Sequence, residues 1–366
     1  MKFSNNLTLK MVKILMRNFF DKNVKTKNIQ MKQFLLISTF AIAGIVANAQ
    51  TDVTEAHKEA TALAQQGKFD EAIGVVTKAY ANNQGNTQLL KDKAYFSYLK
   101  NDYKGAIEAG RMLIEKPDAD EQSFQILGSS LNANHDTKES ERVYRKGIEK
   151  YPNSSVLYSE LGVVLLPNNA QEAINTWEKG IQADPNVSNN YYYLAKQYAQ
   201  GNNNSLWAAL YGEIFVNMET YTERTKEIKP IVYDQYRALF ISPIGLDKYL
   251  KGAPFEKAVA GTLNNVKSAL GKGEISSEDL IALRMRFLLN WYESDNRNKF
   301  PFRLFDRQLQ LTKAGTFDAY NRWLFSSVNE AGFRSWGENH QGEVKEFQNF
   351  HQSVLFKIPQ GEYYQH

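Results

Sequence analysis

The sequence predicts an all-α chain built as an array of stacked helix pairs, and three observations predict it. A small residue recurs as Ala72, Ala106, Ser140 and Ala173, so that successive copies lie 34, 34 and 33 residues apart. Apolar residues between the copies recur at spacings of three and four, the pattern of an amphipathic helix. Prolines stand near the ends of three periods, at 117, 152 and 185, and proline cannot continue a helix. A fixed period in this range is typical of repeat architectures.

Each period is expected to hold two helices joined by a tight turn. In the second period Leu90 and Ala94 lie on the inner stripe of a first helix, and Asn101-Asp102 turns the chain. Ala106 and Leu113 then lie on the stripe of a second helix. We expect the small residues to sit where the two helices of a unit cross, and large ones to fill holes between units. The small set is Ala106, Gly128, Gly162 and Ala173, and the large set is Phe69, Tyr103, Phe124, Tyr144 and Trp177.

The third and fourth periods carry a recognisable motif. The third has Phe124, Leu127-Gly128, Leu131, Tyr144, Gly147 and Pro152, and the fourth has Tyr158, Leu161-Gly162, Trp177, Gly180 and Pro185. In these residues the chain resembles a tetratricopeptide repeat (TPR) protein. The resemblance implies a right-handed α-solenoid of four to five repeats over residues 52–222, with a concave groove lined by the first helix of each pair.

A fifth unit follows and departs from the motif. It contains Tyr191, Leu194-Ala195 and Tyr198, with Ala208 or Ala209 in its second helix. No proline ends this unit, and Asn202-Asn203-Asn204 widens its turn. Terminal repeats are often atypical, so we expect this unit to cap the array.

Residues 225–366 are expected to form a C-terminal helical domain whose role the sequence does not assign. Ser276 and the acidic residues after it have helix-capping chemistry, and Gly332 is expected to stop a helix. Helices are expected at 228–240, 255–270, from 276, 300–313, 317–330 and 343–355.

The N-terminal segment has the three parts of a secretory signal. A basic start at Met31-Lys32 precedes an apolar run over 34–46 and the small residues Ala47-Asn48-Ala49. The run is shorter than the ~20 residues that span a membrane, so we expect cleavage before Gln50 and no membrane span afterwards. Residues 1–30 fit poorly before such a signal, which favours an upstream extension with Met31 as the true start.

Cysteine content and net charge exclude several classes of function. Cysteine is absent, which excludes disulfides, thiolate metal sites and a lipidated N-terminal cysteine. The whole chain has 44 basic and 40 acidic residues, but residues 1–49 hold eight of the basic ones and one of the acidic ones. The net charge of the mature chain is therefore close to −3. A chain without excess positive charge gives no electrostatic argument for nucleic-acid binding. We expect a protein of the periplasm or outer-membrane surface that is not a lipoprotein.

The expected groove is polar, with tyrosines and few charges, which suits an extended peptide or protein segment. TPR proteins that clamp the C-terminal carboxylate of a partner need several basic residues on adjacent first helices. Here only Lys91 lies at such a position, so this subtype is not expected. The candidate partner-binding residues are Lys91, Tyr95, Tyr98, Gln125, Asn132, Ser159, Tyr192 and Lys196.

No catalytic, cofactor-binding or metal-binding residue is predicted. His340, Glu343 and His351 could be drawn as a metal site, but surface residues of a polar helix are the favoured interpretation. Likewise Glu293 and Asp295 are interpreted as a solvated loop rather than a glycosidase pair. Three tryptophans could line a sugar site and are interpreted as core: Trp291, Trp323 and Trp336.

Two hypotheses for function follow. The first is an exported, non-enzymatic scaffold that holds a partner protein or an extended peptide, within an envelope complex. The alternative is an enzyme or carbohydrate-handling domain in residues 230–366 with the array as its docking arm. In sum the chain looks like the exported TPR proteins of Gram-negative bacteria of the Bacteroidetes type, a resemblance that implies no activity and no cofactor.

Overall fold

The computed structural model describes residues 52–200, 204–241, 245–267 and 275–364. Throughout these residues the chain is helical with connecting turns, and they contain no strand. The all-α prediction is therefore confirmed. The predicted extension and signal segment lie outside the described residues. None of the described helices is long and apolar enough to cross a membrane.

The chain forms two compact units, one ending at Lys100 and one beginning at Asn101. The sequence predicts a different boundary, between an array over 52–222 and a helical domain over 225–366. That boundary remains a prediction.

The first unit contains a helix over residues 52–65, then α3 (Phe69–Asn82) and α4 (Thr87–Leu99). Gly67 ends the first turn with φ +76°, a left-handed conformation that glycine adopts without strain. Two residues later α3 begins, and its Ala72 is fully buried. The residues that form the core of this unit are Val53, Ala56, Ala60, Ala72, Val76, Ala79, Leu89 and Phe96.

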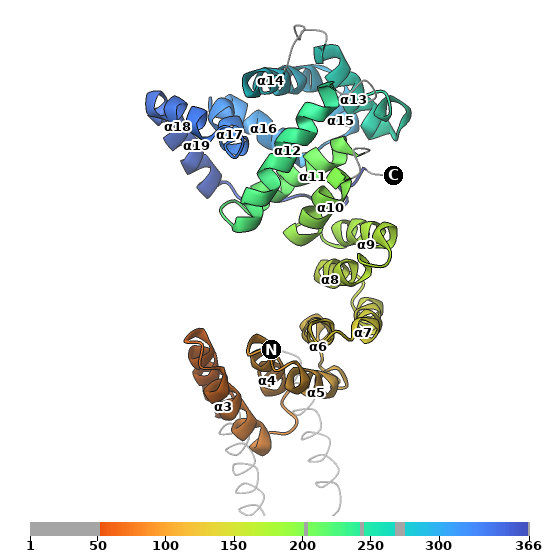
Figure 1. The fold of residues 1–366 in the computed structure, drawn as a ribbon, viewed down its shortest axis with the longest axis vertical. Helices are drawn as coiled ribbons and strands as arrows, with labels where there is room; N and C mark the ends of the chain where they lie inside the picture. Colours follow the sequence, from red (N-terminus) through yellow and green to blue (C-terminus); the bar gives the residue numbers. More distant parts are fainter. Residues whose placement is uncertain (1–51, 201–203, 242–244, 268–274, 365–366) are drawn as a thin grey trace, which may run out of the picture. The chain divides into compact units, whose positions relative to one another are not determined.

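The second unit begins with helices that are packed in sequence order (Figure 1). Short turns join them, and the helix ends fall before Pro117, Pro152 and Pro185 as predicted. These helices are α5 (Tyr103–Ile114), α6 (Glu121–Ala133), α7 (Thr137–Lys150), α8 (Ser155–Leu165), α9 (Ala170–Ala183), α10 (Ser188–Gln200), α11 (Ser205–Met218) and α12 (Glu223–Ile241).

The period is visible in the backbone as well as in the side chains. Gly67, Asn101 and His135 all have positive φ, at +76°, +66° and +64°, and they lie 34 residues apart. Each lies two residues before the start of a second helix. The same turn is therefore built three times, twice without glycine.

Glycines allow the helices of a pair to cross closely. A Cβ at Gly128 would lie 2.4 Å from the Tyr144 ring, and one at Gly162 would lie 2.2 Å from the Trp177 ring nitrogen. Tyr144 and Trp177 are buried against these positions, so the small residues lie at the crossing within a unit, as predicted. The two large residues fill space at the same crossing, and not only between units as expected. By contrast, Phe69 and Tyr103 are only half-buried.

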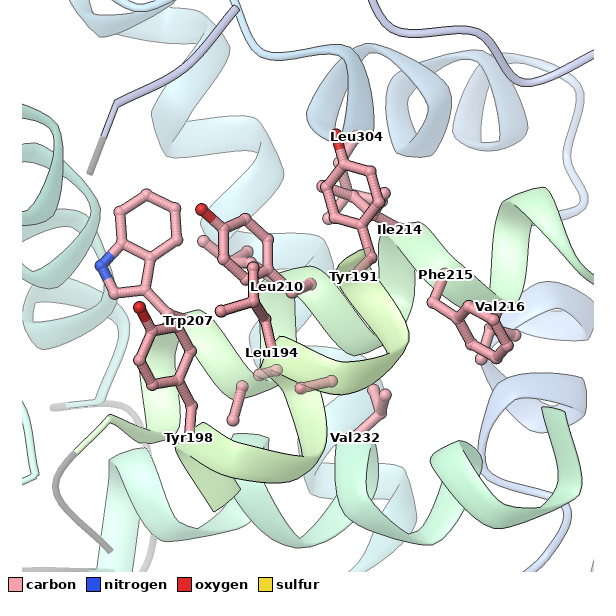
Figure 2. Packing of buried hydrophobic residues seen from close by; sticks show 14 of the residues in the cluster. Tyr191, Leu194, Tyr198, Trp207, Leu210, Ile214, Phe215, Val216, Val232 and Leu304 are labelled. Atoms are coloured by element: carbon pink, nitrogen blue, oxygen red, sulfur yellow. The ribbon is translucent and has the colours of Figure 1, made fainter. Parts of the chain in front are cut away.

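The fifth unit is core, so the expectation that it caps the array is wrong. Every residue of α11 from Ser205 to Asn217 is buried. A helix that is apolar all round is enclosed on all sides, and here α10, α12 and α16 (Arg303–Lys313) contribute to the enclosure. Figure 2 shows Trp207, Leu210 and Ile214 of α11 packed between side chains of these helices.

The remaining elements of the second unit are helical, as predicted for this region. Apart from α16 they are η1 (Tyr249–Lys251), α13 (Pro254–Lys267), α14 (Ser277–Glu293), α15 (Asn296–Lys299), α17 (Phe317–Leu324), α18 (Glu330–Asn339) and α19 (Gln341–Ser353). Ser276 and Asp279 form the predicted capping box at the start of α14.

One predicted helix is shorter than expected, and a helix that was not predicted follows it. The expected helix over 317–330 ends at Leu324, and α18 starts only at Glu330. The Asn329 side chain accepts a hydrogen bond from the Gly332 N–H, so Asn329 caps α18 and Gly332 lies in its first turn. The prediction that Gly332 stops a helix is wrong, because the cap at Asn329 starts a helix there.

A single core runs from α6 to the C-terminal segment. Phe255 of α13 lies at an aromatic centre with Trp291, Phe305 and Tyr364. The segment after α19 returns to the α9–α10 turn, where Asn186 bonds both the N–H and the C=O of Ile358. The C-terminal segment is therefore docked on the repeats.

Candidate partner-binding face

The first helices of successive pairs form one face within the second unit. α8 contacts both α6 and α10, and α10 contacts α12. We call the exposed side of α6, α8, α10 and α12 the first-helix face. A hydrogen bond links α6 to α8, from Gln125 to Glu160 at 3.3 Å. Two more link α10 and α12: Arg224 donates to Asn189 at 2.8 Å, and Tyr192 donates to Glu227 at 2.5 Å.

The N-terminal ends of α6 and α8 enclose a hollow of about 290 Å³ on this face. Asp120 caps α6 by accepting from the Ser123 N–H, whereas the Ser154 hydroxyl before α8 is buried with no hydrogen-bond partner among the described residues. Pockets for drug-sized ligands are about 300–1,000 Å³, so this hollow is at the lower end of that range and has room for a side chain. It is lined by Asp120, Glu121, Gln122, Gln125, Ser154, Val156 and Leu157.

Among the described residues, no cation pairs with the carboxylate of Glu160. It is half-buried on α8, and its hydrogen-bond partner is the Gln125 amide. Burial raises the pKa of Glu160, and the bond from Gln125 offsets part of that effect. The pKa of Tyr193 on α10 is raised, mainly by burial and further by the negative charge of the nearby Glu160. The Tyr193 ring stacks on Trp177 at 5.0 Å, which fixes its orientation.

The α10–α12 end of the face is already neutralised within the chain. Lys196 pairs with Glu227 and also lies 4.9 Å from the centre of the Tyr192 ring. Arg224 pairs with Glu219 and lies over the same ring at 5.0 Å. The residues left to meet a partner are therefore those of α6 and α8.

The predicted binding residues fall into three groups. Lys91, Tyr95 and Tyr98 lie on α4 of the first unit, where Tyr95 is 43% exposed and the other two are half-buried. On the first-helix face, Gln125, Asn132 and Lys196 are half-buried.

Two predicted residues are not accessible. Ser159 is 1% exposed, and its carbonyl accepts from the Trp177 ring nitrogen at 3.0 Å. Tyr192 is 8% exposed beneath Lys196 and Arg224. The helix phase used for the prediction placed Ser159 outward, but the neighbouring Glu160 takes the outward position.

Sequence reasoning missed a buried ionic network around Glu213 of α11. Its carboxylate is fully buried and accepts bonds from Arg284 at 2.6 and 2.9 Å, Gln308 at 2.9 Å and Tyr320 at 2.7 Å. Arg284 also donates to Asn321. Although burial opposes ionisation, Arg284 and these donors hold the pKa of Glu213 below its usual value. The one available signal was a glutamate within an otherwise apolar helix.

The cavity beside this network is too small for a substrate. It measures about 20 Å³, room for about one water molecule. Its polar lining residues include Arg284 and Gln308, which are already bonded to Glu213. The arrangement joins α11, α14 and α16 and serves packing.

The residues drawn as a metal site do not converge. Glu343 accepts from the Ala319 N–H, and His340 stacks on Trp336 with ring centres 4.2 Å apart. His351 bonds to Thr220, and burial together with nearby cations lowers its pKa to about 4. Within the described ranges no group of three or more potential ligands could hold a metal ion.

The tryptophans and the carboxylate pair considered as candidate sugar-site residues lie in the core or on the surface. Trp291 and Trp323 are buried, at 1% and 8% exposure, and Trp336 is half-buried. Asp295 pairs with Lys299 across one helical turn on the surface.

This chain is similar to known proteins in its structure, and not detectably in its sequence. No family model and no curated protein matches the chain. Among solved structures, it is similar to a thermophilic TPR protein of Thermus thermophilus, at 13% identity and TM-score 0.42, over 50% of this chain and 99% of that one. It is also similar to the C-terminal part of a TPR repeat-containing protein of Cytophaga hutchinsonii, at 15% identity and TM-score 0.41, over 66% of this chain and 98% of that one.

A third similar structure is YrrB, described as a TPR protein with an unusual peptide-binding site, at 16% identity and TM-score 0.37, over 52% of this chain and 98% of that one. All three identities lie below 25% and the scores below 0.5.

Proposed function

We propose that the protein is an exported, non-enzymatic scaffold that binds a partner protein or an extended peptide on the first-helix face. The observation that carries the proposal is the surface of α6 and α8. It combines a hollow of side-chain size with amide, hydroxyl and carboxylate groups. Most of these groups lie on rigid helices, which favours precise recognition.

The proposal is tested by site-specific photocrosslinking in intact cells. A photoreactive residue at Gln125 of α6 is expected to attach to one discrete partner. The matched control is Glu149 of α7, which is exposed on a second helix. Equal labelling from both positions, or none from Gln125, would contradict the proposal.

Export is the second part of the proposal and rests on the signal pattern over 31–49. The mature protein is expected to begin at Gln50 and to occur in the periplasm or on the outer membrane. N-terminal sequencing of protein from fractionated cells checks both points. A chain that keeps Met31 and remains with the cytosol would contradict it.

A further inference from the structure

The basic residues of the second unit are distributed unevenly among α6, α7 and α8. α6 and α8 contain no lysine or arginine, whereas α7 between them contains five: Lys138, Arg142, Arg145, Lys146 and Lys150. The first-helix face at α6 and α8 is therefore the side on which the chain supplies acids without supplying cations.

Glu160 is the acid for which this matters most. A buried charge is costly unless it is paired, and Glu160 has only the 3.3 Å contact with the Gln125 amide. No described cation lies within ion-pair distance of it, whereas Glu219 and Glu227 on the same face are each paired. Other acids near the hollow are less informative, because Lys150 reaches the Ala119 carbonyl beside Asp120.

The surroundings of Glu160 suit the approach of an organic cation. Tyr193 lies on one side with its ring held against Trp177, and an aromatic ring attracts a cation through its face. Gln125 bonds to Glu160 and also lines the hollow. A side chain crossing the hollow would therefore reach the carboxylate along Gln125.

We propose that the first-helix face recognises a basic segment of its partner, and that a lysine or arginine of that segment pairs with Glu160 beside Tyr193. The inference rests on the proposed function and names the chemistry of the partner. Binding would give the Glu160 carboxylate a cationic donor in addition to, or in place of, its 3.3 Å bond from the Gln125 amide. The attraction between opposite charges strengthens such a bond further.

The test uses the mature chain and three fluorescein-labelled peptides, read by fluorescence anisotropy at low and high salt. One peptide alternates lysine with alanine, and the others carry glutamine or glutamate in place of lysine. The lysine peptide is expected to bind best, and Glu160→Gln is expected to weaken it by roughly tenfold. Glu160→Asp keeps the charge and should retain most of the binding.

Glu149→Gln is the matched control, because it removes the same charge from an exposed site on α7. It should leave binding within about twofold. No preference for lysine, or equal weakening by Glu160→Gln and Glu149→Gln, would overturn the inference. Circular dichroism of each variant verifies that the helices are intact.

The two proposals can fail separately. If crosslinking from Gln125 still captures the partner but Glu160→Gln leaves that capture unchanged, the basic-segment inference is wrong and the scaffold proposal stands. If Gln125 captures nothing, the scaffold proposal itself fails.

Discussion

Close contacts at single glycines hold the repeat pairs together. Gly162 lies against Trp177, and Gly128 lies against Tyr144. Both aromatic rings are buried and also hydrogen-bonded, Trp177 to Ser159 and Tyr144 to Ser129. A ring anchored in this way cannot move aside to admit a methyl group.

Gly162→Ala is therefore expected to destabilise the protein by about 1–3 kcal/mol, the usual cost of overpacking. Gly261 is the matched control, since it lies within α13 and a Cβ there would meet nothing within 4 Å. Gly261→Ala should be neutral or stabilising by up to about 1 kcal/mol. Urea unfolding of both variants makes the comparison, and equal stability would contradict the crossing described here.

Glu178 of α9 makes stability depend on pH. It is 4% exposed and accepts from Tyr198 and Tyr211 at 2.7 and 2.9 Å. Burial raises the pKa of Glu178 from 4.5 to about 7, with the tyrosine bonds opposing this. The folded state thus holds the proton more tightly than the unfolded chain. The stabilisation is complete below about pH 4.5 and is lost as the pH rises through about 7.

Glu178→Gln is expected to remove this contribution. The difference in unfolding free energy between wild type and variant should change by a few kcal/mol at most from pH 5 to pH 8, with wild type losing ground as the pH rises. Glu362 also has a pKa raised by burial to about 7, so only part of the total dependence will disappear. An identical pH profile for the two proteins would argue against a buried neutral Glu178.

At the scale of elements, α11 decides how the repeats join the rest of the chain. It is buried on every side and carries Glu213 into the core. Arg284 of α14 and Gln308 of α16 bond to that carboxylate. Directional bonds of this kind set the register of three helices, which apolar contacts alone specify less sharply.

Arg284→Met would leave Glu213 buried without its cation and is expected to cost about 3–5 kcal/mol. Adding Glu213→Gln should recover part of the loss, because the unpaired charge is then gone. Chemical denaturation of the single and double variants measures the coupling. A double variant no more stable than Arg284→Met alone would show that the charge was not the cause.

The split between α17 and α18 shows where element prediction fails. The apolar spacing through 317–330 is compatible with one helix, and the cap at Asn329 competes with that pattern. In the structure α17 ends at the point where Phe325 is buried against Tyr233 of α12. Local sequence alone does not contain that contact.

At the scale of the whole molecule, the core of the second unit is continuous from Phe124 to Ile358. The sequence-predicted boundary near residue 222 passes through this core, just after α11. A chain of residues 50–222 would expose α11 to water along the surfaces that now meet α12 and α16. We expect it to be insoluble or to bind a hydrophobic dye, as compact states with exposed apolar surface do.

A chain of residues 101–366 is the control, because it preserves the second unit intact. It should remain soluble with a helical spectrum and a cooperative thermal transition. Dye binding and circular dichroism compare the two chains. A well-folded 50–222 chain would show instead that the repeats are complete without the later helices.

The sequence by itself determined the repeat. Its period, the turn at Asn101-Asp102, the small residues where the helices of a pair cross and the closing prolines all follow from local geometry that each unit repeats. Only the tertiary structure decided that α11 is core, that Glu213 meets Arg284, and that Glu160 rather than Ser159 faces outward. The reason is that a repeat specifies contacts within a unit and with its neighbours. A carboxylate and its partner 71 residues away are joined only when the whole chain has packed.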